Sequence, residues 1–259
     1  MRGLQWFNAL SAGAPPVDGF PASLRVADGV LGEQKVRFVA VVTDAQNRFP
    51  RARNGEVGLL EGWGLAKAVD EAIARGDKRP IIAIVDVPSQ AYGRREEALG
   101  IHQALAAAAD SYARARLAGH PVIALLVGKA MSGAFLAHGY QANRLIALRD
   151  PGVMVHAMGK ASAARVTLRS VEELEALAAS VPPMAYDIDS YASLGLLWET
   201  LTVNQIEHPT ADDLVRVSDC LQQAIKDVQN SGVRGLRGRL GAVNRAASSR
   251  VRELLREQW

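Results

Sequence analysis

The chain has 259 residues, of which 49% are hydrophobic and 22% are charged, with one cysteine and a formal net charge of +3. This composition is typical of a globular protein and excludes a disordered, collagen-like or disulfide-stapled chain. The longest apolar stretches, such as residues 121–127, fall far short of the ~20 residues that a membrane span requires. The N-terminus lacks the apolar core of a secretory signal. We therefore expect a cytoplasmic protein that makes no contact with a membrane.

The first 35 residues are rich in glycine and proline, and they predict an extended N-terminal arm (1–35) with one short strand at most. From residue 36 onward, hydrophobic runs alternate with segments of helical spacing. The expected longer strands are 36–43, 80–87 and 121–127, and the helices that follow them are 56–75, 96–117 and 133–140. Shorter strands are expected at 145–148, 153–156 and 198–203, and further helices at 160–165, 171–179, 210–229 and 242–257.

Strand, loop and helix in series predict an α/β domain with a largely parallel sheet over residues 36–230. The strands are continuously hydrophobic, so both faces of the sheet should be covered by helices. The remaining segment, 231–259, carries seven arginines and two glutamates. This charge is too local to indicate nucleic-acid binding by the whole surface. We expect no nucleic-acid partner, and instead a basic C-terminal helix packed on the domain or on a partner subunit.

Ligands of open α/β sheets bind beyond the carboxyl ends of the strands, so the loops after Val42, Val85 and Val127 are the places for a site. The third loop, Gly-Lys-Ala-Met-Ser-Gly-Ala at 128–134, is rich in small residues where a strand turns into a helix. The first amides of a helix have no partner within it, so such a turn can stabilise an enolate or a tetrahedral oxyanion. The alternative is that the small residues only allow close packing of the helix on the sheet.

The five histidines indicate a functional site less clearly than the loop at 128–134 does. His156 ends a predicted strand, where it could act as an acid, bind a carboxylate or simply be a buried structural residue. The other four histidines have no metal-ligand spacing with one another or with Cys220: His102, His120, His138 and His208. We therefore expect no metal site.

Four segments in order resemble the C-terminal-type carboxyltransferase domain of acyl-CoA carboxylases. They are Pro-Ile-Ile-Ala-Ile-Val-Asp-Val-Pro at 80–88, Gly-His-Pro-Val-Ile at 119–123, Val-Gly-Lys-Ala-Met-Ser-Gly-Ala at 127–134 and Val-Met-Val-His-Ala-Met-Gly at 153–159. The whole chain is most similar to the gamma-subunit family of malonate decarboxylases. This resemblance implies a crotonase-like fold, a spiral of strand-strand-helix units with a largely parallel sheet covered by helices.

The resemblance also implies a site. It places a backbone oxyanion hole at the amides of Gly133 and Ala134, with Ser132 where relatives commonly have glycine. The relatives' Ser-Pro-Glu segment is His-Ala-Met at 156–158 here, so contacts specific to biotin cannot be carried over. This difference is consistent with a member of the carboxyltransferase family that does not use biotin. The expected catalytic positions are Gly133, Ala134 and Ser132, and the expected substrate-binding residues are Lys129, Met131, Gln90, His156 and Met158.

The implied reaction is the removal of carbon dioxide from a malonyl thioester on an acyl carrier protein, through an enolate, to leave an acetyl thioester. The implied partners are a beta subunit, which cradles the thioester, and the acyl carrier subunit. This chain would handle the carboxylate side and bind no cofactor directly, because the carrier's prosthetic group holds the substrate.

Three other interpretations remain open at this point. A biotin-dependent carboxyltransferase would move the malonyl carboxyl group to a biotin carrier. A serine hydrolase would use Ser132 with His208 and either Asp187 or Asp189, since Ala-x-Ser-x-Ala at 130–134 imitates a nucleophile elbow without its usual glycines. A catalytically silent subunit would only complete the site of its partner.

Overall fold

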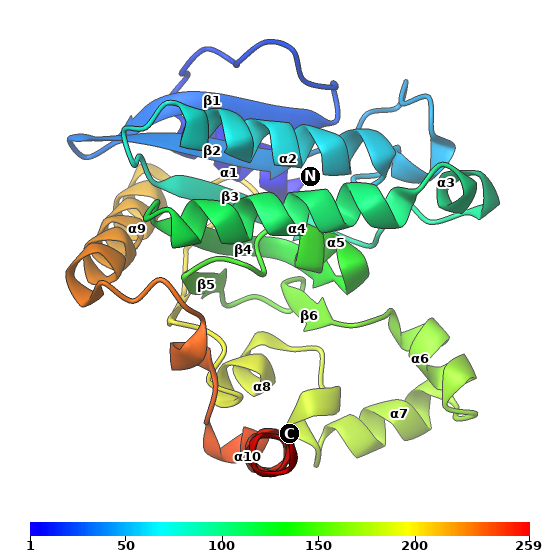
Figure 1. Cartoon of the computed structure of the whole chain (residues 1–259). Coiled ribbons are helices and arrows are strands. Elements are labelled where there is room, and N and C mark those ends of the chain that lie inside the picture. Colours follow the sequence, from blue (N-terminus) through cyan, green and yellow to red (C-terminus); the bar gives the residue numbers. More distant parts are fainter.

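The computed structural model describes residues 1–259 and contains one seven-stranded sheet (Figure 1). The strand order is β1-β2-β3-β4-β5-β7, and β6 pairs with the end of β4. Only the β1–β2 pair is antiparallel. The strands are β1 (Leu24–Leu31), β2 (Gln34–Val41), β3 (Ile81–Val87), β4 (Val122–Met131), β5 (Arg144–Leu148), β6 (Met154–His156) and β7 (Glu199–Leu201). The predicted α/β class with a largely parallel sheet is confirmed.

Helices cover both faces of the sheet, as the hydrophobic strands predicted. Helices α2 (Leu59–Ala74) and α4 (Ile101–Leu117) lie side by side on one face. Gly62 allows their close contact, because a Cβ atom there would lie 2.8 Å from the backbone of Ala104. On the other face, α1 (Arg2–Leu10) contacts β2, β3 and β4, and α9 (Ala211–Ser231) contacts β4. The central strands are consequently buried on both sides.

Apart from α10, the remaining helices have eight residues or fewer. They are α3 (Arg94–Ala98), α5 (Ser132–Ala137), α6 (Lys160–Val166), α7 (Val171–Ala178), α8 (Ile188–Ser193) and α10 (Ala246–Gln258). The helix predicted over 96–117 is divided at Gly100, whose φ of +81° ends one helix and starts the next. Figure 1 shows α6, α7 and α8 gathered beyond β6, away from α2 and α4. No helix combines the length and the apolar character needed to cross a bilayer.

The first 35 residues are not the extended arm that their glycine and proline content predicted. Residues 2–10 form α1, and residues 24–31 form β1, which pairs along its whole length with β2. Trp6 is fully buried in the main core, and its Nε1–H donates to the carbonyl oxygen of Ile206 at 2.8 Å. The prediction failed because all three prolines and only two of the five glycines of this segment lie in the connection between α1 and β1, while Trp6, Phe7 and Leu10 share the buried face of α1.

Replacing Trp6 with Phe should lower the free energy of unfolding by about 1–3 kcal/mol. The change leaves the part-buried carbonyl of Ile206 without its donor and leaves part of the indole volume empty. Urea denaturation of the full chain measures the difference. Trp259→Phe is the matched control, because Trp259 is 99% exposed and its replacement should change stability by less than about 0.5 kcal/mol. Equal effects of the two substitutions would show that α1 does not belong to the core.

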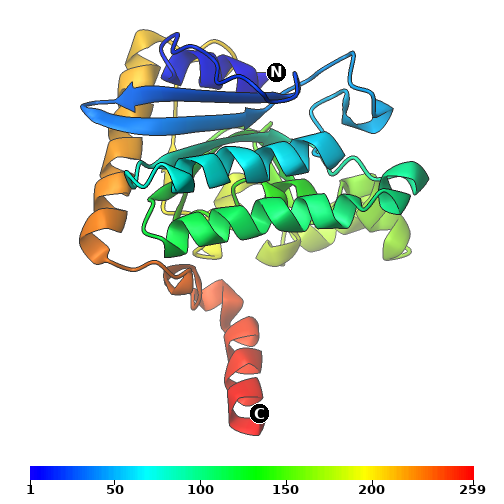
Figure 2. The same ribbon diagram turned by 45° about the horizontal axis from the view of Figure 1, so that its top comes forward.

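The C-terminal segment ends in α10, close to the predicted helix over 242–257. None of its residues is buried. Figure 2 shows this helix extending away from the rest of the molecule. That it packs on a partner subunit therefore stays a prediction.

Candidate functional site

The turn from β4 into α5 forms the centre of the candidate site. Strand β4 runs on to Met131, beyond the predicted end at 127, because its residues 129–131 pair with Met154–His156 of β6. Helix α5 then begins at Ser132, whose φ of +58° is the left-handed conformation that few non-glycine residues adopt. The chain consequently passes from strand to helix without an intervening loop. The amides of Gly133 and Ala134 lie in the first turn of α5, at the carboxyl edge of the sheet.

Asp86, near the end of β3, fixes the position of this turn. Its Oδ1 accepts a hydrogen bond from the Lys129 amide at 3.2 Å, and its Oδ2 accepts one from the Gly3 amide at 3.0 Å. The β3–β4 register shifts at this point. A side chain at Gly128 would overlap the Asp86 carboxylate, so glycine is required there. Asp86 was not predicted as a site residue. The sequence feature that could have identified it is a carboxylate at the end of a strand that is otherwise apolar.

The Gly133 amide is bound by a side chain. Its N–H donates to Oε1 of Gln90 at 3.0 Å. The loop that carries Gln90 is held in place by Val57, which receives a hydrogen bond from the Ala91 amide at 2.8 Å and whose own amide donates to Ser89. No side-chain acceptor reaches the amide of Ala134. The two predicted residues Gly133 and Gln90 are thus in direct contact.

Ser132 and His156 face a different set of neighbours. The Ser132 hydroxyl donates to the carbonyl oxygen of Ala157 at 2.7 Å. The His156 ring stacks on Tyr186 with 3.9 Å between ring centroids, and its Nδ1 lies 3.0 Å from the Met158 carbonyl oxygen. That oxygen also accepts the Tyr186 hydroxyl at 2.8 Å. Burial lowers the pKa of His156, outweighing the hydrogen bond to Met158, so the ring is neutral at pH 7.

A cavity of about 260 Å³ opens beside the turn. Ser132 and His156 line it together with mostly apolar residues: Phe135, Leu136, Tyr140, Val155, Ala157, Pro183, Ala185, Tyr191, Leu194 and Leu196. Gly133 and Gln90 are not among them. Met131 is buried in a small cluster with Leu174 and Tyr186, against which Met158 packs, whereas Lys129 is exposed at the surface. The predicted residues therefore surround the turn on several sides.

The residues of the hydrolase alternative are not arranged as a catalytic triad. Asp187 caps α8 by accepting the Ser190 amide at 2.8 Å, and Asp189 pairs with Arg149 at 3.0 Å. His208 is exposed in the connection that precedes α9. The Ser132 hydroxyl is bonded to a backbone carbonyl, so no base is positioned to take its proton. No group of three or more His, Cys, Asp or Glu residues is placed to hold a metal ion.

The sequence matches a family model over residues 52–259, and this family is described as the malonate decarboxylase gamma subunit. Among curated proteins, the malonyl-S-ACP:biotin-protein carboxyltransferase MADD of Malonomonas rubra is 33% identical over 230 residues, which are 86% of this chain and 75% of that protein.

Solved structures give closer matches. A Pseudomonas malonate decarboxylase hetero-tetramer in complex with coenzyme A contains a chain that is 74% identical, with a TM-score of 0.95. The Pseudomonas MdcD–MdcE hetero-dimer contains one that is 70% identical, with a TM-score of 0.91. In both cases the match covers 100% of this chain and 99% of the other. Transcarboxylase 12S, at 19% identity and a TM-score of 0.64 over 85% of this chain and 41% of that chain, shares the crotonase-like carboxyltransferase fold.

Proposed function

Because the chain belongs to the malonate decarboxylase gamma-subunit family, we propose that it acts with a beta subunit to remove carbon dioxide from a malonyl thioester. The substrate is carried by the prosthetic group of an acyl carrier protein, and the product is the acetyl thioester. Two relatives support these partners: the Pseudomonas enzyme forms a hetero-dimer, and the Malonomonas protein is named for malonyl-S-ACP. The chain itself binds no cofactor in this proposal, and it works in the cytoplasm.

One contact carries the proposal: the hydrogen bond between the Gly133 amide and Gln90 Oε1. Its length of 3.0 Å lies within the range of about 2.7–3.1 Å expected between an oxyanion-hole donor and the oxygen it binds. A side-chain oxygen can swing away, whereas a backbone carbonyl in a sheet or helix cannot. The beta subunit holds the rest of the thioester, and the thioester carbonyl oxygen reaches across the subunit boundary to replace Gln90, with Ala134 supplying the second amide.

These amides stabilise the charge that decarboxylation creates. When the bond between the carboxylate and the α-carbon breaks, its electron pair moves toward the thioester carbonyl and forms an enolate, while carbon dioxide leaves. Donors fixed beside that oxygen bind the enolate more strongly than the neutral thioester, so they lower the barrier. A proton added to the α-carbon then gives the acetyl group. Four residues around the turn position the malonyl group: Lys129, Met131, His156 and Met158.

Replacing Ser132 with Ala separates this mechanism from hydrolysis by a serine nucleophile. We expect kcat of the assembled beta and gamma subunits to stay within about threefold of wild type, because the amides of Gly133 and Ala134 remain in place. Loss of the bond to Ala157 accounts for the small decrease. A nucleophilic serine would instead reduce kcat by about 10⁴-fold or more. Decarboxylation of malonyl-carrier substrate, followed as released carbon dioxide, distinguishes the two.

The basic C-terminal segment is proposed to steer the acyl carrier protein to the site. Carrier proteins are generally acidic, and α10 exposes its arginines to solvent. Changing Arg245, Arg250 and Arg252 together to Gln should lower kcat/KM about 3–10-fold at low salt, because long-range attraction speeds encounter. At high salt the variant and wild type should converge, since screening removes that attraction from both. An unchanged salt dependence of kcat/KM would exclude steering by this segment.

A further inference from the structure

A buried polar network lies behind the loop that carries Gln90. Its centre is Glu61, a fully buried residue in the first turn of α2. The two carboxyl oxygens of Glu61 accept three hydrogen bonds, and all three donors are neutral. They are the Ser23 hydroxyl, the Asn47 side-chain amide at 2.7 Å and the Gly58 backbone amide at 3.0 Å. The proposed reaction gives Glu61 no role.

Three segments that are far apart in the sequence meet at Glu61. Ser23 directly precedes β1, Asn47 follows β2, and Gly58 directly precedes α2. An apolar side chain of similar size is often as stable in the interior as a carboxyl group, because the carboxyl group must leave water. Hydrogen bonds are directional, however, so a fully satisfied network fixes how the segments that it joins lie relative to one another.

Two contacts link this network to the loop that carries Gln90. A Cβ atom at Gly58 would lie 3.1 Å from the Cβ atom of Ala91, so the two segments pack closely. The residue before Gly58, Val57, donates its amide to Ser89 at 3.0 Å and accepts the amide of Ala91 at 2.8 Å. These two hydrogen bonds flank Gln90 on both sides. The position of Gln90 therefore depends on the position of residues 57–58.

Gln90 in turn occupies the amide that the substrate needs. The Gly133 amide donates to Gln90 Oε1 at 3.0 Å, and it lies in the first turn of α5, where a helix provides no partner of its own. In the function proposed above, a substrate oxygen binds this same amide, so Gln90 must leave first. A site that its own protein occupies part of the time has a lower apparent affinity for every other ligand.

We propose that Glu61 is a positioning residue. Through Gly58 and Val57 it holds Gln90 on the Gly133 amide, and Gln90 acts as an internal competitor that sets the affinity of this amide for oxygen ligands. This inference rests on the proposed function. Competition by Gln90 weakens every such ligand by the same factor. Small free carboxylates, which bind weakly, are thereby kept off the amide at concentrations at which the malonyl thioester, held also by the beta subunit, still binds.

Amide hydrogen exchange, followed by NMR on the full chain, measures the contact between Gln90 and Gly133 without any catalysis. Glu61→Gln keeps the size of the side chain, but in either orientation its NH2 group faces a donor, so at least one of the three donors loses its partner. Residues 57–58 then hold Gln90 less firmly. We expect the Gly133 amide to exchange about threefold faster or more. Unchanged exchange at Gly133 would overturn the positioning role and leave the proposed function untouched.

The KM of the assembled beta and gamma subunits for the malonyl-carrier substrate tests the competition. Glu61→Gln should lower KM about threefold and keep kcat within about twofold of wild type, because Gln90 leaves the amide more readily. Gln90→Ala should lower KM at least as much, and Glu61→Gln should then add no further change. A residue with a merely structural role would instead lower kcat and raise KM, and that result, or additive effects of the two substitutions, would overturn the proposal.

The two measurements together separate this inference from the function on which it rests. If Glu61→Gln speeds exchange at Gly133 while KM is unchanged in both Glu61→Gln and Gln90→Ala, Glu61 does position Gln90, but the amide does not bind the substrate. That outcome would contradict the competitor role and the proposed function together.

Glu173→Gln is the matched control. Glu173 accepts the backbone amide of Ser170 at 2.8 Å at the start of α7, which is the same kind of cap that Glu61 forms at Gly58. Exchange at Gly133 and KM should both stay within about 1.5-fold of wild type, because this cap belongs to another helix.

Gly58→Ala provides a second variant in case Glu61→Gln does not fold. Its added Cβ atom would lie 3.0 Å from Glu61 Oε2 and 3.1 Å from the Cβ atom of Ala91, so these neighbours must move apart by a few tenths of an ångström. We expect the same faster exchange at Gly133 and the same lower KM. Wild-type values of both in Gly58→Ala would contradict the proposal.

Discussion

Replacing Gly133 with Val is expected to lower kcat of the assembled decarboxylase by about 10²–10³, the usual effect of losing one oxyanion-hole donor. A Cβ atom at this position would lie 3.5 Å from the Gln90 side chain, so it fits the folded chain. The γ-methyl groups of valine reach further, into the space from which a substrate oxygen must approach the amide. The substitution should therefore block catalysis while the subunit still folds and assembles.

Two controls accompany this measurement. Gly238→Val introduces the same side chain where no atom lies within 4 Å, and it should leave kcat unchanged. The melting temperature of Gly133→Val and its assembly with the beta subunit should match those of Gly238→Val. If Gly133→Val retains kcat within about threefold of wild type, the amide does not bind the reacting oxygen, and the chain is better explained as a silent subunit that completes its partner's site.

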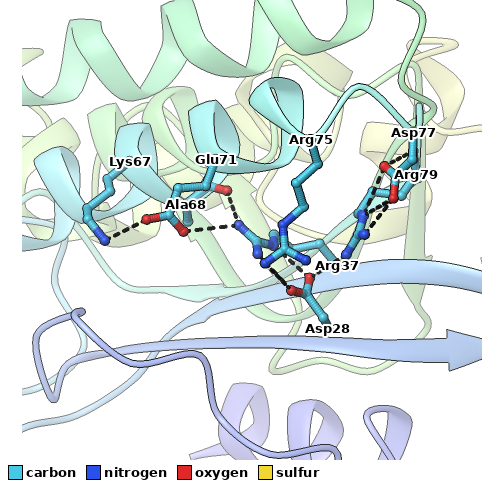
Figure 3. Close-up of polar contacts among 8 residues, drawn as sticks. All are labelled: Asp28, Arg37, Lys67, Ala68, Glu71, Arg75, Asp77 and Arg79. Carbon is cyan, nitrogen blue, oxygen red and sulfur yellow. Dashed lines mark hydrogen bonds and ion pairs between the residues drawn. The ribbon is translucent and has the colours of Figure 1, made fainter.

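Replacing Asp28 with Asn is expected to destabilise the chain by about 3–5 kcal/mol, the usual effect of removing one partner from a buried ion pair. Figure 3 shows the cluster around this carboxylate. Asp28 pairs with Arg37 near the start of β2, at the end of the parallel strands opposite the candidate site. Arg37 is fully buried, and its Nε and Nη2 each donate to Asp28 at 2.8 Å. Arg75 and Arg79 also pair with Asp28, at 3.0 and 3.1 Å. Asparagine would leave three guanidinium groups without this shared counter-ion.

The same cluster predicts how stability depends on pH. Burial raises the pKa of Asp28, but the hydrogen bonds and charges of Arg37, Arg75 and Arg79 outweigh it and hold the pKa below its ordinary value of 3.8. A lowered pKa in the folded state stabilises the protein above pH 3.8, and this contribution is lost as the pH falls through the folded-state pKa. The stability difference between wild type and Asp28→Asn should therefore be full at pH 7 and shrink at pH values below 3.8.

Urea unfolding at the two ends of this pH range measures both effects. Asp110→Asn is the matched control, because Asp110 forms an exposed pair with Arg114 on one helix, and its loss should cost less than about 0.5 kcal/mol. A loss for Asp28→Asn no larger than for this control would show that the cluster contributes little to stability.

The central architecture could be predicted from the sequence because its signals are local. The hydrophobic run at 81–87 and the helical spacing at 59–74 each indicated an element within a few residues of its observed limits. Helix α1 was not predicted, because the glycines and prolines near it favour an extended segment. Strand β4 was predicted to end too early, because its last residues are ordered by pairing with β6, which a local pattern does not reveal.

The candidate site could be predicted in position but not in detail. The small residues at 132–134 predicted a turn from strand to helix, and in the structure Gly133 lies at the turn from β4 into α5. The contact between Gly133 and Gln90 joins residues 43 positions apart, and the anchoring of Lys129 by Asp86 depends on a shift of register between two strands. Such contacts depend on the tertiary structure. The sequence alone could therefore identify Gly133, Gln90 and Lys129, but it could not show which residues they contact.

A crystal structure of the beta and gamma subunits with a non-reactive enolate analogue of the malonyl thioester would show whether the Gly133 amide binds the enolate oxygen. We expect an analogue oxygen about 2.7–3.1 Å from the Gly133 nitrogen, within reach of the Ala134 amide, and a Gln90 side chain turned away. A bound analogue with Gln90 Oε1 still accepting from the Gly133 amide would contradict this expectation.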